Sequence, residues 1–176
     1  MAQWFEKLAS YLERKEQEKQ NGKYVKVILD RDTDEPYLIR YYLLNLRPLA
    51  RLNLHKVLRS DIDGLHDHPW PWATYILSGG YWESTPGGRF WRKPGTLRLR
   101  SPKALHRLEV DPTVQEPVWT LFFMGPKMKE WGFLDEDEVW VKWDTYLAKR
   151  RERQNEQAKT TTKHYRSEQR AEHARE

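Results

Sequence analysis

The sequence predicts an all-β barrel that carries one helix at each end. Short runs of apolar, β-branched and aromatic residues recur along the central part of the chain, which is typical of strands. Gly, Pro and Asp residues separate these runs at regular intervals and indicate tight turns. No segment between the runs is long enough for a crossover helix, which disfavours a parallel α/β sheet.

The N-terminal segment, residues 1–22, predicts an amphipathic helix over residues 3–20. Asn21-Gly22 can end this helix, because glycine readily adopts the left-handed conformation that follows a helix. The residues from Glu13 to Gln20 are polar, so we expect only the first three turns to dock on the barrel. The apolar residues that recur there at helical spacing are Trp4, Phe5, Leu8, Tyr11 and Leu12.

The central segment, residues 23–143, predicts the barrel itself. We expect residues 72–77 and 81–84 to form a hairpin that Gly79 closes. The expected strands are 24–29, 37–46, 50–58, 73–77, 81–84, 89–92, 97–100, 104–110 and 118–124.

The C-terminal segment, residues 144–176, predicts a helix that begins near Asp144, frays near Thr160–Thr162 and continues as a disordered tail. Residues 148–176 contain nine Lys or Arg against five Glu, so this segment carries most of the net charge of +5. A solvated tail is the simpler interpretation, and weak, salt-dependent contact with nucleic-acid phosphates is the alternative. The barrel segment is close to neutral, and we do not expect it to bind nucleic acid.

Composition excludes several classes of protein. The chain has 176 residues, of which 13% are aromatic, so a packed domain is present although 32% of the residues are charged. It contains no cysteine, so thiolate nucleophiles and thiolate metal sites are excluded, and any metal must be held by His, Asp or Glu. Neither a membrane span nor a secretion signal is recognisable, which predicts a cytoplasmic protein.

His66-Asp67-His68 is the pattern most suggestive of chemistry. Residues two apart on a strand point to the same face, so the two imidazoles can chelate one ion while Asp67 points away. Taken alone, the triplet is also compatible with an ordinary pair of hydrogen-bonded histidines. Two later residues, Gly95 and His106, also bear on the metal interpretation, because they belong to a second motif.

The pattern resembles the cupin superfamily of small jelly-roll barrels. Its first motif contains a His-x-His pair and a later glycine, which match His66, His68 and Gly79. Its second motif begins with a glycine and ends with a histidine, which match Gly95 and His106. The sequence departs from the motifs at Ser60, Trp72 or Ala73, Ser101, Pro102 and Lys103.

More locally, residues 50–143 resemble a group of small cupin proteins from phages and bacteria that have no assigned activity. A phage-encoded chain would act in the host cytoplasm. The resemblance implies three metal ligands, His66, His68 and His106. This sequence lacks the glutamate ligand that many cupins use. Glu83, Asp61 and Asp63 are the carboxylates that could replace it.

The all-histidine metal set resembles that of three-His cupin dioxygenases. The resemblance implies a mononuclear non-haem Fe(II) enzyme that oxidises a small anionic molecule, although Zn, Mn or Ni would also suit the site. Two alternatives stay open. One is a non-catalytic module that binds a small molecule or nucleotide, and the other is a metal-dependent sugar isomerase or epimerase.

Further residues are candidates for roles near the metal. His55 could act as an acid or base, and it could equally be a hydrogen-bonded structural histidine. Arg98 and Arg100 could hold an anionic substrate, unless they face solvent. Trp72 could stack on a flat substrate or simply pack in the core. A homodimer is expected by analogy with other cupins.

Overall fold

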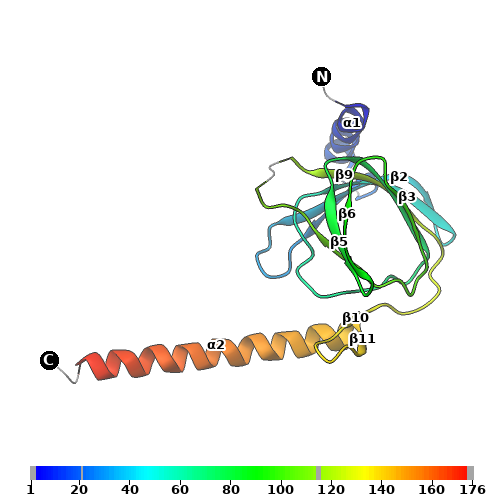
Figure 1. Cartoon of the computed structure of the whole chain (residues 1–176). Coiled ribbons are helices and arrows are strands. Elements are labelled where there is room, and N and C mark those ends of the chain that lie inside the picture. The colour runs from blue at the N-terminus through cyan, green and yellow to red at the C-terminus, as the bar shows by residue number, and fades with distance from the viewer. Residues whose placement is uncertain (1–2, 21, 114–115, 174–176) are drawn as a thin grey trace.

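The computed structural model describes residues 3–20, 22–113 and 116–173. Eleven strands and two helices follow one another along these residues, and Figure 1 shows the strands wrapped around a central space. The elements are α1 (Trp4–Lys19), β1 (Val25–Leu29), β2 (Pro36–Leu46), β3 (Ala50–Val57), β4 (Trp72–Ser78), β5 (Tyr81–Thr85), β6 (Gly88–Arg92), β7 (Leu97–Arg100), β8 (Arg107–Glu109), β9 (Val118–Met124), β10 (Gly132–Leu134), β11 (Trp140–Lys142) and α2 (Trp143–His173).

The strands form separate antiparallel sheets rather than one closed barrel. The larger sheet has six strands in the order β1-β2-β3-β9-β4-β7, and a three-stranded sheet has the order β6-β5-β8. A two-stranded sheet joins β10 to β11. The predicted all-β architecture is therefore confirmed, and the closure implied by the word barrel is not.

The predicted hairpin around Gly79 is wrong. β4 pairs with β7 and β9, whereas β5 pairs with β6 and β8, so the chain passes from one sheet to the other at this glycine. Gly79 has φ +74°, a conformation that residues with a side chain rarely adopt. A Cβ atom on the next residue, Gly80, would lie 2.5 Å from the Trp91 ring, so both glycines are required for this crossing.

Helix α1 covers one face of the larger sheet. Phe5, which is 2% exposed, packs on Trp119 with 5.2 Å between ring centroids. Glu13 extends the contact, because its carboxylate accepts a hydrogen bond from the buried Tyr41 hydroxyl at 2.5 Å. The buried cluster comprises Phe5, Ala9, Leu12, Tyr41, Leu54 and Trp119.

The other face of the larger sheet meets the smaller sheet. Leu38, Val57, Ile76 and Val118 come from the larger sheet and pack against Tyr81 from β5. The two faces of β2 are thus distinguished by alternation: Tyr41 points to α1, whereas its neighbours in the strand point inward. The remaining inward positions line the cavity that is described below.

The C-terminal elements lie against one end of the strands (Figure 1). Phe133 of β10 stacks on Tyr146 of α2 at 4.3 Å, and Trp131 stacks on Trp143 at 6.0 Å. Arg150 then pairs with Asp32 and Asp63 of the body. Asp144 lies within the first turn of α2 rather than before it, and the helix continues past Thr160–Thr162 to His173, so the predicted fraying point is wrong.

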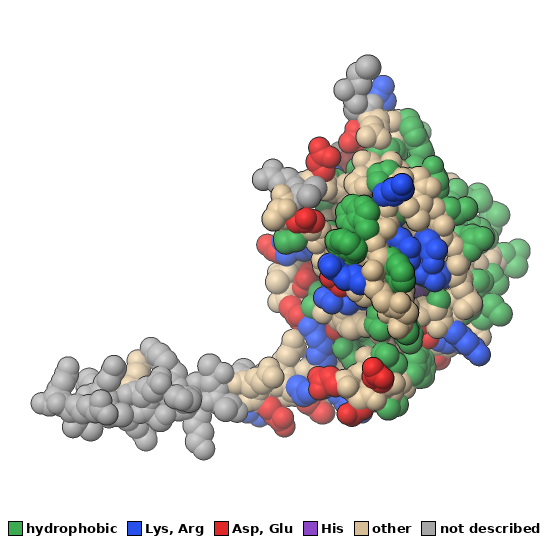
Figure 2. Space-filling model, viewed as in Figure 1, with side chains coloured by type: hydrophobic (Ala, Val, Ile, Leu, Met, Phe, Trp, Pro, Cys, Tyr) green, Lys and Arg blue, Asp and Glu red, His purple; other side chains and the backbone are tan. Residues whose placement is uncertain are grey.

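In the view of Figure 2, Lys and Arg side chains lie across the front of the body, and Asp and Glu side chains lie mostly along its left and lower edges. Leu44, Leu46 and Leu49, around the turn between β2 and β3, are about half exposed or more. No described helix combines the length and the apolar character that a membrane crossing requires.

Candidate metal centre

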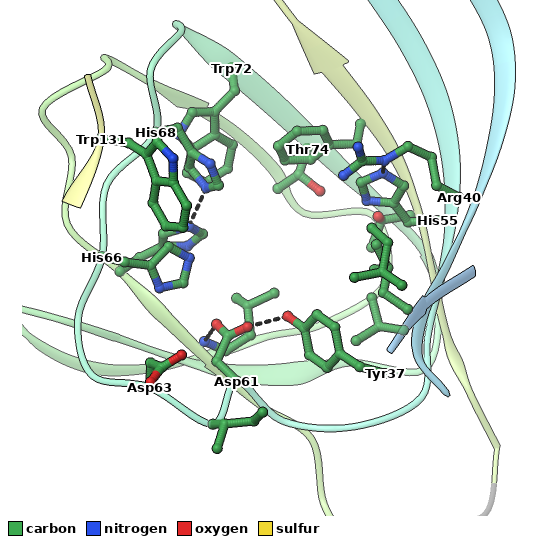
Figure 3. A pocket seen from close by; sticks show the side chains of 18 of the residues that line it. Tyr37, Arg40, His55, Asp61, Asp63, His66, His68, Trp72, Thr74 and Trp131 are labelled. Atoms are coloured by element: carbon green, nitrogen blue, oxygen red, sulfur yellow. Dashed lines mark hydrogen bonds between the residues drawn. The ribbon is translucent and has the colours of Figure 1, made fainter. Parts of the chain in front are cut away.

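A cavity of about 360 Å³ lies between the two sheets and extends to the segment around β10. This volume is in the range of sites that bind small molecules. Figure 3 shows its side chains arranged around an open centre, with histidines on one wall and Arg40 on the opposite wall. Its polar and aromatic lining includes Tyr37, Arg40, His55, Asp61, His66, His68, Trp70, Trp72, Thr74, His106, Phe122, Trp131 and Phe133.

Three histidines converge on this cavity from distant parts of the chain. The ligand atoms of His66, His68 and His106 all lie within 4.8 Å of one another. Nε2 of His68 is 2.9 Å from Nε2 of His106. The side chains that the sequence assigned as metal ligands therefore form one cluster.

The backbone fixes two of the three rings. His66 and His106 form an isolated antiparallel bridge, in which each backbone N–H donates to the other's carbonyl at 2.9 Å. His66 also bridges to Phe133, so β10 lies against the same segment. These pairings hold the rings of His66 and His106 side by side, with 5.0 Å between centroids.

Asp67 anchors the loop that closes this end of the cavity. It is 2% exposed, and its carboxylate accepts hydrogen bonds from the backbone N–H of Gly132 at 2.9 Å and from the Trp140 indole at 3.0 Å. Lys129 pairs with the same carboxylate. The alternation in the triplet is as predicted: His66 and His68 face the cavity, whereas Asp67 holds the β10–β11 hairpin from behind.

The electrostatics of the cluster favour neutral imidazoles, which are the form that binds metals. Burial lowers the pKa of His66, and burial together with the neighbouring His106 and His66 rings holds the pKa of His68 well below its usual value. The residues also fit an ion sterically. Two ligands that lie about 2.1 Å from one ion at a right angle are ~3.0 Å apart, close to the separation of the His68 and His106 nitrogens.

Glu83 lies behind His106 rather than in the cluster. Its carboxylate is 1% exposed, and Oε1 lies 3.4 Å from Nδ1 of His106, which is long for a hydrogen bond but close for an electrostatic contact. Burial would raise the pKa of Glu83, but the contacts with His106 and Arg92 outweigh it and lower the pKa to about 2. A charged carboxylate at this position favours a proton on Nδ1, which leaves Nε2 free to face the cavity.

The other two candidate carboxylates are also engaged elsewhere. Asp61 accepts hydrogen bonds from the Tyr37 hydroxyl and from the backbone N–H of Leu108. Asp63 pairs with Arg31 at 2.9 Å and with Arg150. Among the described residues, no carboxylate belongs to the three-histidine group, so the site has no charged protein ligand.

His55 lies in the same cavity but not in the metal group. Its Nε2 accepts a hydrogen bond from Nε of Arg40 at 3.0 Å, and its ring stacks on Phe122 at 4.9 Å. Burial, and then the charge of Arg40, hold the pKa of His55 well below its usual value. Because Nε2 accepts from Arg40, the proton of the neutral ring is on Nδ1.

Trp72 lies against the three-histidine cluster. Its ring centroid is 4.6 Å from that of His106 and 5.3 Å from that of His68. It also stacks on Phe122, and its buried indole N–H has no hydrogen-bond partner among the described residues. Trp72 thus lines the cavity, and its contact with a substrate stays a prediction.

Arg98 and Arg100 do not line this cavity, although the sequence made them candidates for substrate binding. Both lie on the inward face of β7, since the alternating Leu97 and Leu99 are 58% and 74% exposed. The guanidinium of Arg100 donates to Glu83 at 3.0 Å. Arg100 therefore neutralises the carboxylate of Glu83 behind His106. The expectation that Arg98 and Arg100 line the substrate cavity is wrong.

Sequence reasoning missed Arg40 and Tyr37 as cavity residues. Both lie on β2, where Tyr41 packs under α1, so strand alternation places Arg40 on the opposite, inward face. The signal was present in the sequence, but it required knowledge of which face of this strand the helix covers. Trp131 and Phe133, whose position the sequence left open, line the mouth of the cavity.

No protein-family model matches this sequence, and no curated protein matches it. Solved structures do match its fold. A cupin-2 domain from Rhodospirillum rubrum superposes with a TM-score of 0.54 at 13% identity, over 67% of this chain and 79% of that one. A cupin 2 conserved barrel domain protein from Rhodopseudomonas palustris superposes with a TM-score of 0.51 at 15% identity, over 65% and 80% of the two chains. The chain therefore has the fold of the cupin superfamily.

Proposed function

We propose that this protein is a metal-dependent enzyme that acts on a small anionic molecule in the cavity between its sheets. His66, His68 and His106 would hold one divalent ion. The observation that carries the proposal is the convergence of three imidazoles, from two distant segments, on a cavity of about 360 Å³. Without an ion, one hydrogen bond can form between the Nε2 atoms of His68 and His106, whereas an ion would engage a nitrogen lone pair on each of the three rings.

The reaction that we propose is dioxygenation, with Fe(II) as the ion. Three protein ligands leave further coordination positions open, and a site without a carboxylate ligand retains the full charge of the ion. When bound, the ion would supply Lewis acidity and, as Fe(II), electrons for oxygen chemistry. The walls that Trp72, Phe122 and Trp131 form would exclude water from the reacting groups.

The remaining polar groups would orient the substrate and move protons. His55 holds the guanidinium of Arg40 through Nε2, so it is a positioning residue whose proton at Nδ1 is the one available for exchange. Elsewhere in the cavity lining, the hydroxyl of Tyr37 donates a hydrogen bond to the carboxylate of Asp61. Burial and then the Asp61 charge raise the pKa of Tyr37 well above its usual value, so the phenol stays protonated.

The Tyr37–Asp61 pair specifically favours a second candidate, a metal-dependent isomerase or epimerase. Such a reaction needs a group that gives a proton and one that takes it on the same substrate. A protonated phenol hydrogen-bonded to a carboxylate in the cavity is a suitable pair. Dioxygenation needs no such pair, so the effect of Tyr37→Phe separates the two candidates.

Metal content tests the proposal directly. Protein purified without chelators should contain about one equivalent of a transition metal by mass spectrometry, and His68→Ala and His106→Ala should each lose most of it. His55→Gln is the matched control, because it alters a histidine of the same cavity outside the group and should retain the metal. Metal content that is unchanged in His68→Ala and His106→Ala would show that the ligand assignment is wrong.

Oxygen uptake tests the reaction. Protein reconstituted anaerobically with Fe(II) should consume oxygen with at least one member of a panel of small thiols, amino acids and 2-oxoacids. Metal-loaded protein that consumes no oxygen, but exchanges carbon-bound protons of sugar phosphates with heavy water, would favour the isomerase. Loss of that exchange in Tyr37→Phe would assign it to the Tyr37–Asp61 pair.

A further inference from the structure

Arg40 is a cation inside the cavity that has no anionic partner among the described residues. Its Nε donates to a neutral acceptor, the imidazole of His55, and the other groups that act on its charge are the hydroxyls of Tyr42 and Tyr37 and the cation of Arg51. The described part of the chain offers Arg40 no ion pair. Arg40 is only partly exposed, so its guanidinium is partly desolvated, and an anionic ligand would supply the charge that it lacks.

The other charged groups of the cavity are balanced by the protein itself. Arg31 pairs with Asp63, whose second partner is Arg150. Asp61 accepts the Tyr37 hydroxyl and the Leu108 backbone N–H, so its charge is satisfied by hydrogen bonds. Of the two described cations that line this cavity, Arg31 and Arg40, only Arg40 therefore has no ion pair.

The position of Arg40 relative to the histidines defines the shape of a ligand. In Figure 3, Arg40 and His55 lie on the wall opposite His66 and His68, with the open centre of the cavity between them. Trp72 and Thr74 lie between the two walls in Figure 3, and the Phe122 ring contacts both His55 and His68. A ligand that reached both walls would have an anionic group at one end and a metal-binding group at the other.

We propose that Arg40 binds the carboxylate of the substrate, and that the substrate is a small acid whose opposite end faces the three-histidine site. Only the second part, the end of the substrate that faces the three histidines, rests on the proposed function. A carboxylate fits better than a phosphate, because one uncompensated guanidinium matches one negative charge, whereas a phosphate monoester carries nearly two. His55 acts here as a positioning residue, since its bond to Nε leaves the terminal amino groups of Arg40 for the carboxylate.

Ligand titrations test the assignment. The probes are the dicarboxylates malonate, succinate, glutarate and adipate, each compared with its monoamide, and binding is followed by tryptophan fluorescence, since Trp70, Trp72 and Trp131 line the cavity. In metal-loaded protein, at least one diacid should bind about tenfold or more tightly than its monoamide. Arg40→Gln should abolish that preference, and Arg40→Lys should restore part of it.

Arg31→Gln is the matched control. It removes the same charge from the same cavity, but from a residue that Asp63 already neutralises, so the preference for the diacid should persist. If Arg40→Gln binds the diacids as the native protein does, or if no diacid is preferred over its monoamide, the assignment is overturned. Binding of inorganic phosphate that depends on Arg40, without any for the carboxylates, would overturn the choice of carboxylate.

The two proposals can fail separately. Each variant is also analysed for metal, and Arg40→Gln should retain it, because Arg40 is not a member of the histidine group. The titrations are repeated with acetate against acetamide in metal-free protein, where only the Arg40 end can act. If neither the protein purified without chelators nor the reconstituted protein holds metal, the metal proposal is refuted, and acetate binding that depends on Arg40 would still leave the Arg40 assignment standing.

Discussion

The carboxylate of Glu83 lies 3.4 Å from Nδ1 of His106, on the side of the ring away from the cavity. Arg92 and Arg100 donate to its other oxygen at 2.7 and 3.0 Å, so one buried charge is shared among three partners. An acidic group behind a metal-binding imidazole orients the ring and makes it a better ligand. Glu83 is thus outside the three-histidine group, but its charge can orient the His106 ring.

Glu83→Gln should weaken metal binding while it preserves the shape of the side chain. We expect the metal affinity to fall about 10- to 100-fold, which competition with a chelator would measure. We also expect the free energy of unfolding to fall by about 3 kcal/mol, because two partly buried arginines lose their counter-charge. Glu109→Gln is the control: it also removes a carboxylate paired with an arginine, Arg89, but no histidine faces it, so metal affinity should not change.

His55 should make the stability of the metal-free protein depend on pH. Its pKa in the folded protein lies well below 6.5, so the unfolded chain binds a proton there first as the pH falls. Stability is therefore full above about pH 6.5 and falls as the pH decreases toward the folded pKa, by up to ~1.4 kcal/mol per pH unit.

Urea unfolding at several pH values with a chelator present measures this effect. His66 and His68 contribute in the same direction, so His55→Gln should reduce the slope below about pH 6.5 by up to one proton equivalent rather than remove it. Above about pH 7.5 the variant and the native protein should show parallel curves. An unchanged slope at low pH would mean that His55 is not buried as a neutral base.

The packing of α1 on the sheet predicts a strong contrast between two adjacent aromatic residues. Phe5 is 2% exposed and contacts Trp119, whereas Trp4 is 55% exposed. Phe5→Ala should lower the free energy of unfolding by about 3–5 kcal/mol, because it leaves a cavity between the helix and the sheet. Trp4→Ala should cost less than about 1 kcal/mol in the same urea titration. Equal losses would show that α1 is not docked on this face.

Local patterns were sufficient to predict the strands, because each strand from β1 to β9 is bounded by its own turn residues. The His66 and His68 positions were predictable for a similar reason, since alternation in the triplet puts Asp67 on the opposite side. The third candidate ligand, His106, required the resemblance to a known superfamily. Its spatial proximity results from the pairing of two distant segments, which no local pattern specifies.

The errors have the same physical origin. β4 and β5 are adjacent in sequence, but their partners are distant strands, so a turn at Gly79 was interpreted as a hairpin. Three-residue strands such as β10 and β11 are too short to show alternation, so no strand was expected at either position. Arg98 and Arg100 were correctly placed on one face of a strand. Which charged group they would meet there depended on the long-range position of Glu83.

Asp67 should couple the stability of the β10–β11 hairpin to the geometry of the site. Asp67→Asn keeps the size of the side chain, but it removes the charge that Lys129 neutralises and weakens the bonds from Gly132 and Trp140. We expect the free energy of unfolding to fall by about 2–4 kcal/mol, since charged hydrogen bonds at a buried carboxylate contribute more than neutral ones.

In the same variant, the segment at residues 131–134, which lies against the cavity, should open locally more often than the whole fold unfolds. Because Phe133 bridges directly to His66, hydrogen exchange of the backbone N–H groups in residues 131–134 should accelerate more than exchange in β3 and β9. Asp111→Asn is the control, because this exposed aspartate contacts only its neighbour Thr113 among the described residues and should change neither quantity. Uniform acceleration of hydrogen exchange across all strands would mean that Asp67 supports the fold as a whole and has no particular role at residues 131–134.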